Sequence, residues 1–182
     1  QSHIVAALQE YIDAPRFQAH LLHGVTGSGK TEVYKKIIEH TLAQNKSVIL
    51  LLPEVTLATQ FERILKKELP ASIPLLSFHS AVSATQKRLL WQTLLHNKPC
   101  LIIGVHLPIL LPISNLGLII IDEEHETGYQ EKKHPKINSK EAALLRAQIT
   151  GIPILLGSAT PSLTSLYQVH EKKWLLHSLH KR

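Results

Sequence analysis

Cysteine and methionine are almost absent from this sequence of 182 residues, which holds one Cys and no Met. Because Cys100 has no second cysteine to pair with, the chain can form neither an internal disulfide nor a zinc site built on cysteines. This composition fits a reducing compartment, and with no signal-peptide pattern near Gln1 it predicts a cytoplasmic location. The missing initiator Met predicts a processed or excised part of a longer polypeptide.

Long apolar runs are missing as well. Segments such as Ser47–Leu52 and Leu116–Ile121 are far shorter than the roughly 20 residues that cross a bilayer, so we expect no membrane partner. Hydrophobic residues make up 44% and charged residues 19%, which are ordinary proportions for one soluble globular domain. The formal net charge of +6 would suit nucleic acid, but lysines scattered in pairs would also serve solubility, so charge leaves both interpretations open.

Short, continuously apolar segments alternate with longer amphipathic ones along the chain. Strands that are apolar along their full length indicate a parallel sheet covered on both faces, and we predict one α/β domain over residues 1–182. Residues 172–182 could form one more strand. Ligands of such sheets bind beyond the carboxyl ends of the strands, so the informative residues should follow strands. The expected strands are Ala19–His23, Ser47–Leu52, Pro74–Phe78, Cys100–Gly104, Gly117–Ile121 and Ile152–Leu156. The expected helices are Ser2–Ile12, Lys30–Gln44, Thr56–Leu69, Ser83–His96, Ser139–Ile149 and Ser162–Val169.

A glycine-rich segment follows the first expected strand. Gly24–Thr31 reads GVTGSGKT and matches the phosphate-loop pattern G-x-x-x-x-G-K-[ST], in which backbone N–H groups and a helix N-terminus converge on phosphate oxygens. Lys30 is expected to reach the β- and γ-phosphates, and the Thr31 hydroxyl to bind Mg²⁺. A structural turn would also be rich in glycine, but the strand–loop–helix context favours an ATP site. The residues expected to bind the triphosphate are Gly27, Ser28, Gly29, Lys30 and Thr31.

Four polar residues, Asp122–His125, directly follow the expected strand Gly117–Ile121. An Asp at the tip of a buried parallel strand holds magnesium in phosphate-loop enzymes, and an adjacent Glu can accept a proton from the attacking water. We assign Asp122 to the metal and Glu123 to water activation, and expect Asp122 at the tip of a strand neighbouring the first one, close to Lys30. Alone, such a turn is more often a solvated loop; beside a phosphate loop the catalytic interpretation is favoured.

Small hydroxylated residues follow the strand Ile152–Leu156, in the segment Gly157–Pro161. Ser and Thr are preferred helix caps and Pro is favoured in the first helical turn, so a plain cap is one interpretation. The other is a hinge in which the Ser158 and Thr160 hydroxyls contact the acidic cluster and couple hydrolysis to movement. The position of the segment behind that cluster favours the hinge.

In this order, GSGKT, DEEH and SAT resemble motifs I, II and III of the superfamily-two helicases. The connecting stretches are similar to the primosomal replication-restart helicases nearly letter for letter, over essentially the whole chain. The resemblance implies a three-layer RecA-like P-loop NTPase domain with a mostly parallel sheet. It also implies that this domain is the first lobe of a DEAH-type, 3′-to-5′ DNA helicase that reloads the replication machinery at stalled forks. The stretches that carry the similarity are Gly24–Tyr34, Pro53–Leu57, Phe78–Ser80, Leu116–His125 and Ile152–Ser162.

By position, the resemblance implies that His125, Ser158 and Thr160 couple the ATP site to DNA. Gln1 stands where the family has an adenine-recognising glutamine. N–H groups at the helix start after Pro53 would meet the backbone of single-stranded DNA, although a plain helix start fits this segment equally well. The residues expected to meet DNA are Pro53, Glu54, Thr56, Gln60 and Tyr129.

The same resemblance implies ATP and Mg²⁺ as ligands, with zinc only in parts of the family proteins outside this chain. It implies single-stranded and forked DNA, other primosome proteins and single-strand-binding protein as partners. A second helicase lobe of the same polypeptide, towards which residues 172–182 would lead, would supply an arginine to the ATP site. We therefore expect the isolated chain to bind Mg–nucleotide weakly, and neither to turn over appreciably nor to unwind DNA.

Two segments depart from the family pattern. Gly104–Pro108 reads GVHLP where the family usually has G-T-R-S-A, so His106 replaces a guanidinium that contacts DNA. Residues 136–141 read KINSKE where a family-like sequence is R-Y-H-A-R-D, which reduces the surface for base stacking. Both changes bear on DNA coupling and not on the ATP site.

Three alternative functions remain open from the sequence. One is another superfamily-two translocase, such as a restriction-complex motor. The second is a small-molecule phosphotransferase built on the same phosphate loop, which gives no reason for the SAT element. The third is a non-catalytic binding module, which an ATP affinity unchanged by Lys30→Ala would favour.

Overall fold

The structure is a computed structural model that describes residues 1–130 and 137–179. Every helix and strand expected from the sequence is present, and the extra strand expected in residues 172–182 is confirmed as β7. The strands are β1 (Gln18–Gly24), β2 (Ser47–Leu51), β3 (Leu75–Phe78), β4 (Leu101–Gly104), β5 (Leu116–Ile121), β6 (Pro153–Ser158) and β7 (Trp174–Leu179). The helices are α1 (Ser2–Asp13), α2 (Lys30–Ala43), α3 (Val55–Glu68), α4 (Ala84–Leu95), α5 (Ser139–Thr150) and α6 (Leu163–His170), with short 3₁₀ helices η1 (Leu107–Leu110) and η2 (Thr127–Tyr129).

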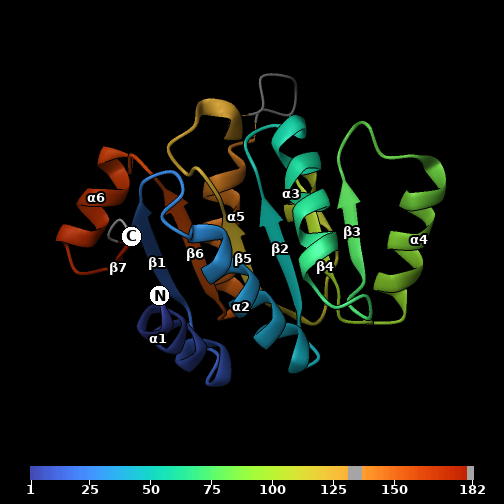
Figure 1. Cartoon of the computed structure of the whole chain (residues 1–182), viewed down its shortest axis with the longest axis horizontal. Helices are drawn as coiled ribbons and strands as arrows, with labels where there is room; N and C mark the ends of the chain where they lie inside the picture. The colour runs from blue at the N-terminus through green and yellow to red at the C-terminus, as the bar shows by residue number, and fades with distance from the viewer. Residues whose placement is uncertain (131–136, 180–182) are drawn as a thin grey trace.

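The strands form one seven-stranded sheet in the order β3-β4-β2-β5-β6-β1-β7 (Figure 1). All pairings between these strands are parallel, so the carboxyl ends of the strands lie along one edge of the sheet. One expectation is corrected: β5, which carries Asp122 at its tip, does not neighbour β1, because β6 lies between them. The phosphate loop and the acidic cluster therefore have to meet across the end of β6.

The core consists of two apolar layers, one on each face of the sheet. Alternate residues of β2 point to opposite faces: Val48 and Leu50 pack with α1, α2 and α3, whereas Ile49 and Leu51 belong to the layer that contains residues of α4 and α5. Val169 of α6 packs against the second layer. Each such buried aliphatic side chain contributes about 1.5–3 kcal/mol relative to an exposed one. This three-layer arrangement holds the strand ends rigidly under the loops. Among the described helices, none is long and apolar enough to cross a membrane.

Helix starts surround the carboxyl edge of the sheet. Helix α2 has Gly29 at its N-cap and α3 has Glu54, and neither residue caps its helix through its side chain. By contrast, the Asn138 side chain accepts hydrogen bonds from the first turn of α5, and the Ser162 side chain does the same for α6. The first turns of α2 and α3 therefore keep N–H groups for an outside acceptor.

Candidate functional site

The segment between β1 and α2 has the backbone of an anion cradle. Gly27 (φ 77°) and Gly29 (φ 95°) both lie in the left-handed region, which other residues rarely adopt. A Cβ on Gly29 would also displace the end of the Gln1 side chain, but the left-handed φ is what requires glycine there. Helix α2 starts directly after Gly29, with its positive end at the loop.

The polar side chains of this loop are those that a phosphate would need. Lys30 is only 8% exposed, and its Nζ donates a hydrogen bond to the Gly24 carbonyl at 2.8 Å. The buried Ser28 Oγ has no hydrogen-bond partner among the described residues, which is costly unless a ligand supplies one. Thr31 lies half-buried in the first turn of α2. A buried ammonium, an orphaned hydroxyl and open N–H groups together fit a triphosphate.

The tip of β5 lies opposite this loop. Glu123 Oε1 is 3.6 Å from Lys30 Nζ, and Glu123 itself has a left-handed φ of 48°, an uncommon conformation for a residue other than glycine. The Asp122 backbone N–H bonds to the Leu51 carbonyl at 3.0 Å, which fixes the strand end. The predicted catalytic residues Lys30, Asp122 and Glu123 therefore lie at one site.

Tyr34 and Gly157 hold Asp122 in position, and no local sequence pattern predicts this role for either residue. The fully buried Tyr34 hydroxyl donates to Asp122 Oδ1 at 2.7 Å from α2, across the end of β6. A Cβ on Gly157 of β6 would overlap that hydroxyl and lie 3.2 Å from Asp122 Oδ1, so only glycine leaves room for the contact. Burial raises the pKa of Asp122, and the hydrogen bond from Tyr34 partly offsets this. A carboxylate that is costly to bury, at the edge of the sheet where the phosphate loop also lies, is a ligand that fits Mg²⁺.

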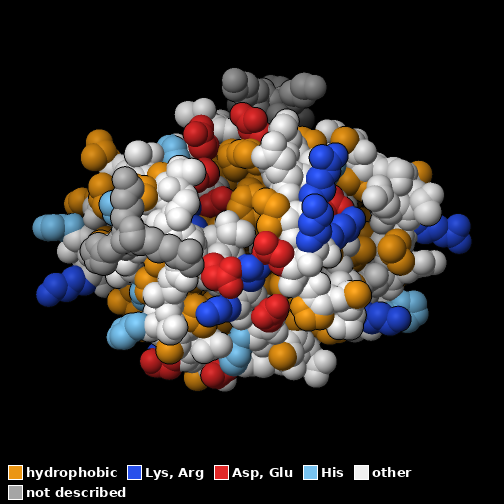
Figure 2. Space-filling view, in the orientation of Figure 1, with side chains coloured by type: hydrophobic (Ala, Val, Ile, Leu, Met, Phe, Trp, Pro, Cys, Tyr) orange, Lys and Arg blue, Asp and Glu red, His pale blue; other side chains and the backbone are white. Residues whose placement is uncertain are grey.

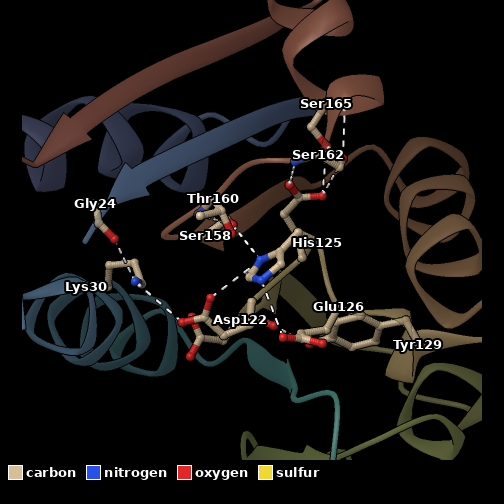
Figure 3. A network of polar contacts seen from close by, with 12 residues as sticks. Gly24, Lys30, Asp122, His125, Glu126, Tyr129, Ser158, Thr160, Ser162 and Ser165 are labelled. Atoms are coloured by element: carbon tan, nitrogen blue, oxygen red, sulfur yellow. Dashed lines mark hydrogen bonds and ion pairs between the residues drawn. The ribbon is translucent and has the colours of Figure 1, made fainter. Parts of the chain in front are cut away.

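The three predicted coupling residues also meet. His125 Nδ1 lies 2.8 Å from Ser158 Oγ, which in turn accepts a hydrogen bond from the Thr160 N–H at 3.0 Å (Figure 3). His125 also lies near two carboxylates, with Nδ1 3.7 Å from Glu123 Oε2 and Nε2 3.4 Å from Glu126 Oε1. The acidic cluster is thus bonded to the end of β6, as a hinge would require. The coupling role itself stays a prediction.

Glu124 is the residue of the acidic cluster for which the sequence predicts no role. Its buried carboxylate accepts hydrogen bonds from the Ser162 N–H (2.7 Å), the Ser162 hydroxyl (3.0 Å) and the Ser165 hydroxyl (2.8 Å). It also pairs closely with Lys140 Nζ. Burial alone would raise the pKa of Glu124, but the bond from Lys140, helped by Ser162 and Ser165, holds that pKa below its usual value. One carboxylate therefore ties the start of α5 and the start of α6 to the tip of β5.

A separate cleft of about 430 Å³ lies beyond the ends of β2, β3 and β4. It is lined by residues of three segments: Pro53–Val55, from the stretch that the resemblance assigned to DNA, Phe78–Ser80, from a family-like stretch, and Val105–Leu107, from the first altered segment. Thr56 and Gln60 are exposed on α3 beside it. Figure 2 shows basic side chains gathered over α3, and Arg63, Lys66 and Lys67 are exposed on that helix.

Two predicted DNA contacts are not supported as direct contacts. The Tyr129 ring is 2% exposed and its hydroxyl bonds to the Leu51 carbonyl at 3.1 Å, so it presents no face on which a base could stack. Pro53 is buried with Gly128 packed against its carbonyl, and as a proline it has no N–H to donate. Glu54, Thr56 and Gln60 remain exposed to a ligand. Lys136, in the second altered segment, lies outside the described residues.

Gln1 lies over the phosphate loop. Its side-chain amide Nε2 donates to the Ser28 carbonyl at 3.2 Å. This places the glutamine that the resemblance linked to adenine at the nucleotide loop, where an amide can both donate to and accept from a base. Base recognition by Gln1 remains a prediction.

The fold and the converging loops define a helicase domain of the phosphate-loop class. The family model of the DEAD/DEAH box helicases matches residues 4–169, and the chain belongs to this family. Within it, the chain is 38% identical to the replication restart protein PriA of Bacillus subtilis over 175 residues, or 96% of this chain. It is 40% identical to PriA of Chlamydia trachomatis over 179 residues, or 98% of this chain. The similarity to replication-restart helicases expected from the motifs is confirmed.

The chain spans only part of these relatives, namely 22% of the B. subtilis protein and 24% of the C. trachomatis protein. Solved structures agree on the fold. RecG bound to a three-way DNA junction superposes with a TM-score of 0.67 at 21% identity, over 99% of this chain and 24% of that one. A DEAD box protein from Methanococcus jannaschii gives 0.66 at 17% identity, over 96% of this chain and 48% of that one. The expected RecA-like, three-layer fold is therefore confirmed.

Proposed function

We propose that this chain is the first ATP-binding lobe of a 3′-to-5′ DNA helicase that acts in replication restart. One observation carries the proposal: Lys30 Nζ in the phosphate loop lies 3.6 Å from Glu123 Oε1 at the tip of β5, although β6 separates the two strands. A turn that served only the fold would not need a buried ammonium and acidic side chains facing one another across a strand end. The 36–40% identity to PriA proteins favours replication restart over another translocase.

Different residues of the site would hold the triphosphate, bind the metal and activate the attacking water. Backbone N–H groups of Gly27–Lys30 and the Lys30 ammonium would hold the triphosphate, while the Asp122 carboxylate and the Thr31 hydroxyl would hold Mg²⁺. When bound, the metal neutralises charge on the phosphate oxygens. Glu123 faces the Lys30 ammonium, which is the position from which it would accept the proton of the attacking water.

Further along the carboxyl edge of the sheet, away from the phosphate loop, the proposed substrate is single-stranded DNA. The cleft beyond β2, β3 and β4, the exposed N-cap residue Glu54 and the exposed α3 residues Thr56 and Gln60 would contact its backbone. Forked DNA, other primosome proteins, single-strand-binding protein and a cytoplasmic location complete the proposal by analogy with the PriA relatives. A second lobe would supply the missing arginine, so the isolated chain would bind Mg–nucleotide weakly and turn over slowly.

Titration of the chain with Mg–ATP, wild type against Lys30→Ala, tests the nucleotide site. We expect Lys30→Ala to weaken binding about 10- to 100-fold, because hydrogen bonds to charged groups contribute about 1.5–3 kcal/mol. Lys36→Ala is the matched control, since Lys36 is exposed on the same helix. An affinity unchanged by Lys30→Ala would contradict the proposal and favour a non-catalytic module.

Phosphate release tests the role of the second lobe. We expect little release from the isolated chain, with or without single-stranded DNA, and DNA-stimulated release from the full-length polypeptide. Robust turnover by the isolated chain that Lys30→Ala abolishes would show that a second lobe is not required. Transfer of phosphate to a small acceptor, without any effect of DNA, would favour the phosphotransferase alternative.

A further inference from the structure

One exposed face of α3 continues the cleft down the length of the helix. Thr56 and Gln60 are exposed beside the cleft, near the start of α3. Arg63 and Lys67 follow three and seven residues after Gln60, a spacing that puts them on the same helix face, and both are exposed. From Thr56 to Lys67 the helix rises about 16 Å, so this α3 row ends well away from the cleft residues Pro53–Val55.

The two cations of the α3 row have no ion-pair partner among the residues that the structure describes. The acidic residues of α3 itself are already paired with other lysines. Glu62 Oε1 lies 2.5 Å from Lys66 Nζ, and Glu68 Oε2 lies 2.7 Å from Lys35 Nζ of α2. The acidic charge of the helix is therefore neutralised off the row, while the positive charge on the row is left for an outside anion. Figure 2 shows these basic side chains running along α3.

The cleft at the head of the row has groups that a ligand would satisfy. The buried His79 Nδ1 has no hydrogen-bond partner among the described residues, and His79 lines the cleft. The N-cap residue Glu54 does not cap α3 through its side chain, so the first turn keeps open N–H groups. Because the exposed Glu54 carboxylate repels an anion, the cations farther along the helix must supply the attraction.

We propose that the α3 row is a second, electrostatic part of the single-stranded DNA site. The inference rests on the proposed function: the strand held in the cleft continues along α3, where Arg63 and Lys67 neutralise its phosphates. Side chains four residues apart on a helix lie about 5–6 Å apart, so the two cations can meet separate phosphates of one strand. The row contains no aromatic side chain on which a base could stack, so its contacts are independent of DNA sequence.

The test measures the affinity of the full-length polypeptide for oligothymidylates over a range of salt concentrations. Each phosphate contact to a single strand contributes about 0.7 to the slope of log K against log salt. We expect Arg63→Ala/Lys67→Ala to make that slope about 1.4 shallower on a long oligonucleotide and to weaken its binding. On a short oligonucleotide that fills only the cleft, slope and affinity should match the wild type. Probes of about 4 and about 16 nucleotides span the site sizes of single-strand-binding modules.

Arg88→Ala/Lys98→Ala is the matched control. It removes the same two types of side chain and the same charge, from α4 and the turn after it, and α4 packs on the opposite face of the sheet from α3. Its salt slope should equal that of the wild type on both probes. All of the substituted residues are exposed, so both double variants should unfold at the wild-type urea midpoint.

The outcomes separate the two proposals. If the wild type binds neither oligonucleotide, the proposed function fails and the α3 row fails with it. If the wild type binds the long oligonucleotide and Arg63→Ala/Lys67→Ala keeps the wild-type slope, only the α3 row is overturned. An equal loss of slope on the short probe, or in the Arg88→Ala/Lys98→Ala control, would show diffuse attraction by net charge and would also overturn it.

Discussion

Replacing the buried Glu124 by Gln should destabilise the folded chain by about 3 kcal/mol. The substitution removes the counter-charge of Lys140, whose side chain is only 16% exposed, and breaking a buried ion pair by removing one partner costs about 3–5 kcal/mol. The lower value applies because the Gln amide can still accept from the Ser162 N–H. With a denaturant slope of about 2 kcal/mol per molar urea, the unfolding midpoint should fall by about 1.5 M.

Two further variants make this test specific to the ion pair. Glu141→Gln removes an exposed carboxylate next to Lys140 on α5 and should change stability by less than about 0.5 kcal/mol. In the double variant Glu124→Gln/Lys140→Met no uncompensated ammonium is buried, so its destabilisation should be smaller than the sum of the two single effects. A Glu124→Gln midpoint equal to that of Glu141→Gln would refute the reasoning.

Two other changes test the buried histidine and the contact across β6. Burial, with repulsion from His177 and Arg16, lowers the pKa of His20 from 6.5 to about 3. Below pH 6.5 the unfolded chain therefore binds a proton at His20, whereas the folded chain does not. Stability should therefore fall as the pH falls, by about 2 kcal/mol between pH 6.5 and 5, and urea unfolding of His20→Phe should lack this loss. Gly157→Ala would place a Cβ against the Tyr34 hydroxyl and displace Asp122, so it should weaken Mg–ATP binding in a titration. In the control Gly151→Ala the new Cβ would meet no neighbouring atom, and the left-handed φ of 64° should cost stability but not Mg–ATP affinity. An unchanged Mg–ATP affinity in Gly157→Ala would mean that the Tyr34 contact does not position the carboxylate.

The elements of the fold were predictable because each has a local cause. Continuous apolar runs such as Ser47–Leu52 can only be buried strands at that length, and the pattern GSGKT fixes both a loop and a helix start. The rule that parallel strands present their ligands at one edge then placed Lys30 and Asp122 on the same side of the sheet.

What could not be predicted depends on contacts between residues far apart in the chain. Glu124 is held by Lys140, 16 residues away, and by Ser162 and Ser165, 38 and 41 residues away. The bond between Tyr34 and Asp122 joins residues 88 positions apart. No local signal marks such partners, because they follow from the order of the strands.

Tyr129 shows how family resemblance can misplace a residue. The resemblance counted Tyr129 among the residues that meet DNA, but burial against the ends of β2 and β5 decides its contacts. That burial could not be predicted locally, since the packing involves Leu51 and Ser139 from other elements. Its position now points to a role inside the protein and not at the DNA.

The dependence of ATP affinity on magnesium tests the central claim most directly. If the Asp122 carboxylate holds the metal of a triphosphate seated on the Lys30 loop, the wild-type chain should bind ATP more tightly with Mg²⁺ than with a chelator, and Asp122→Asn should abolish that gain. The chelated affinities of the two proteins should be similar. A gain from Mg²⁺ that persists undiminished in Asp122→Asn would contradict the account.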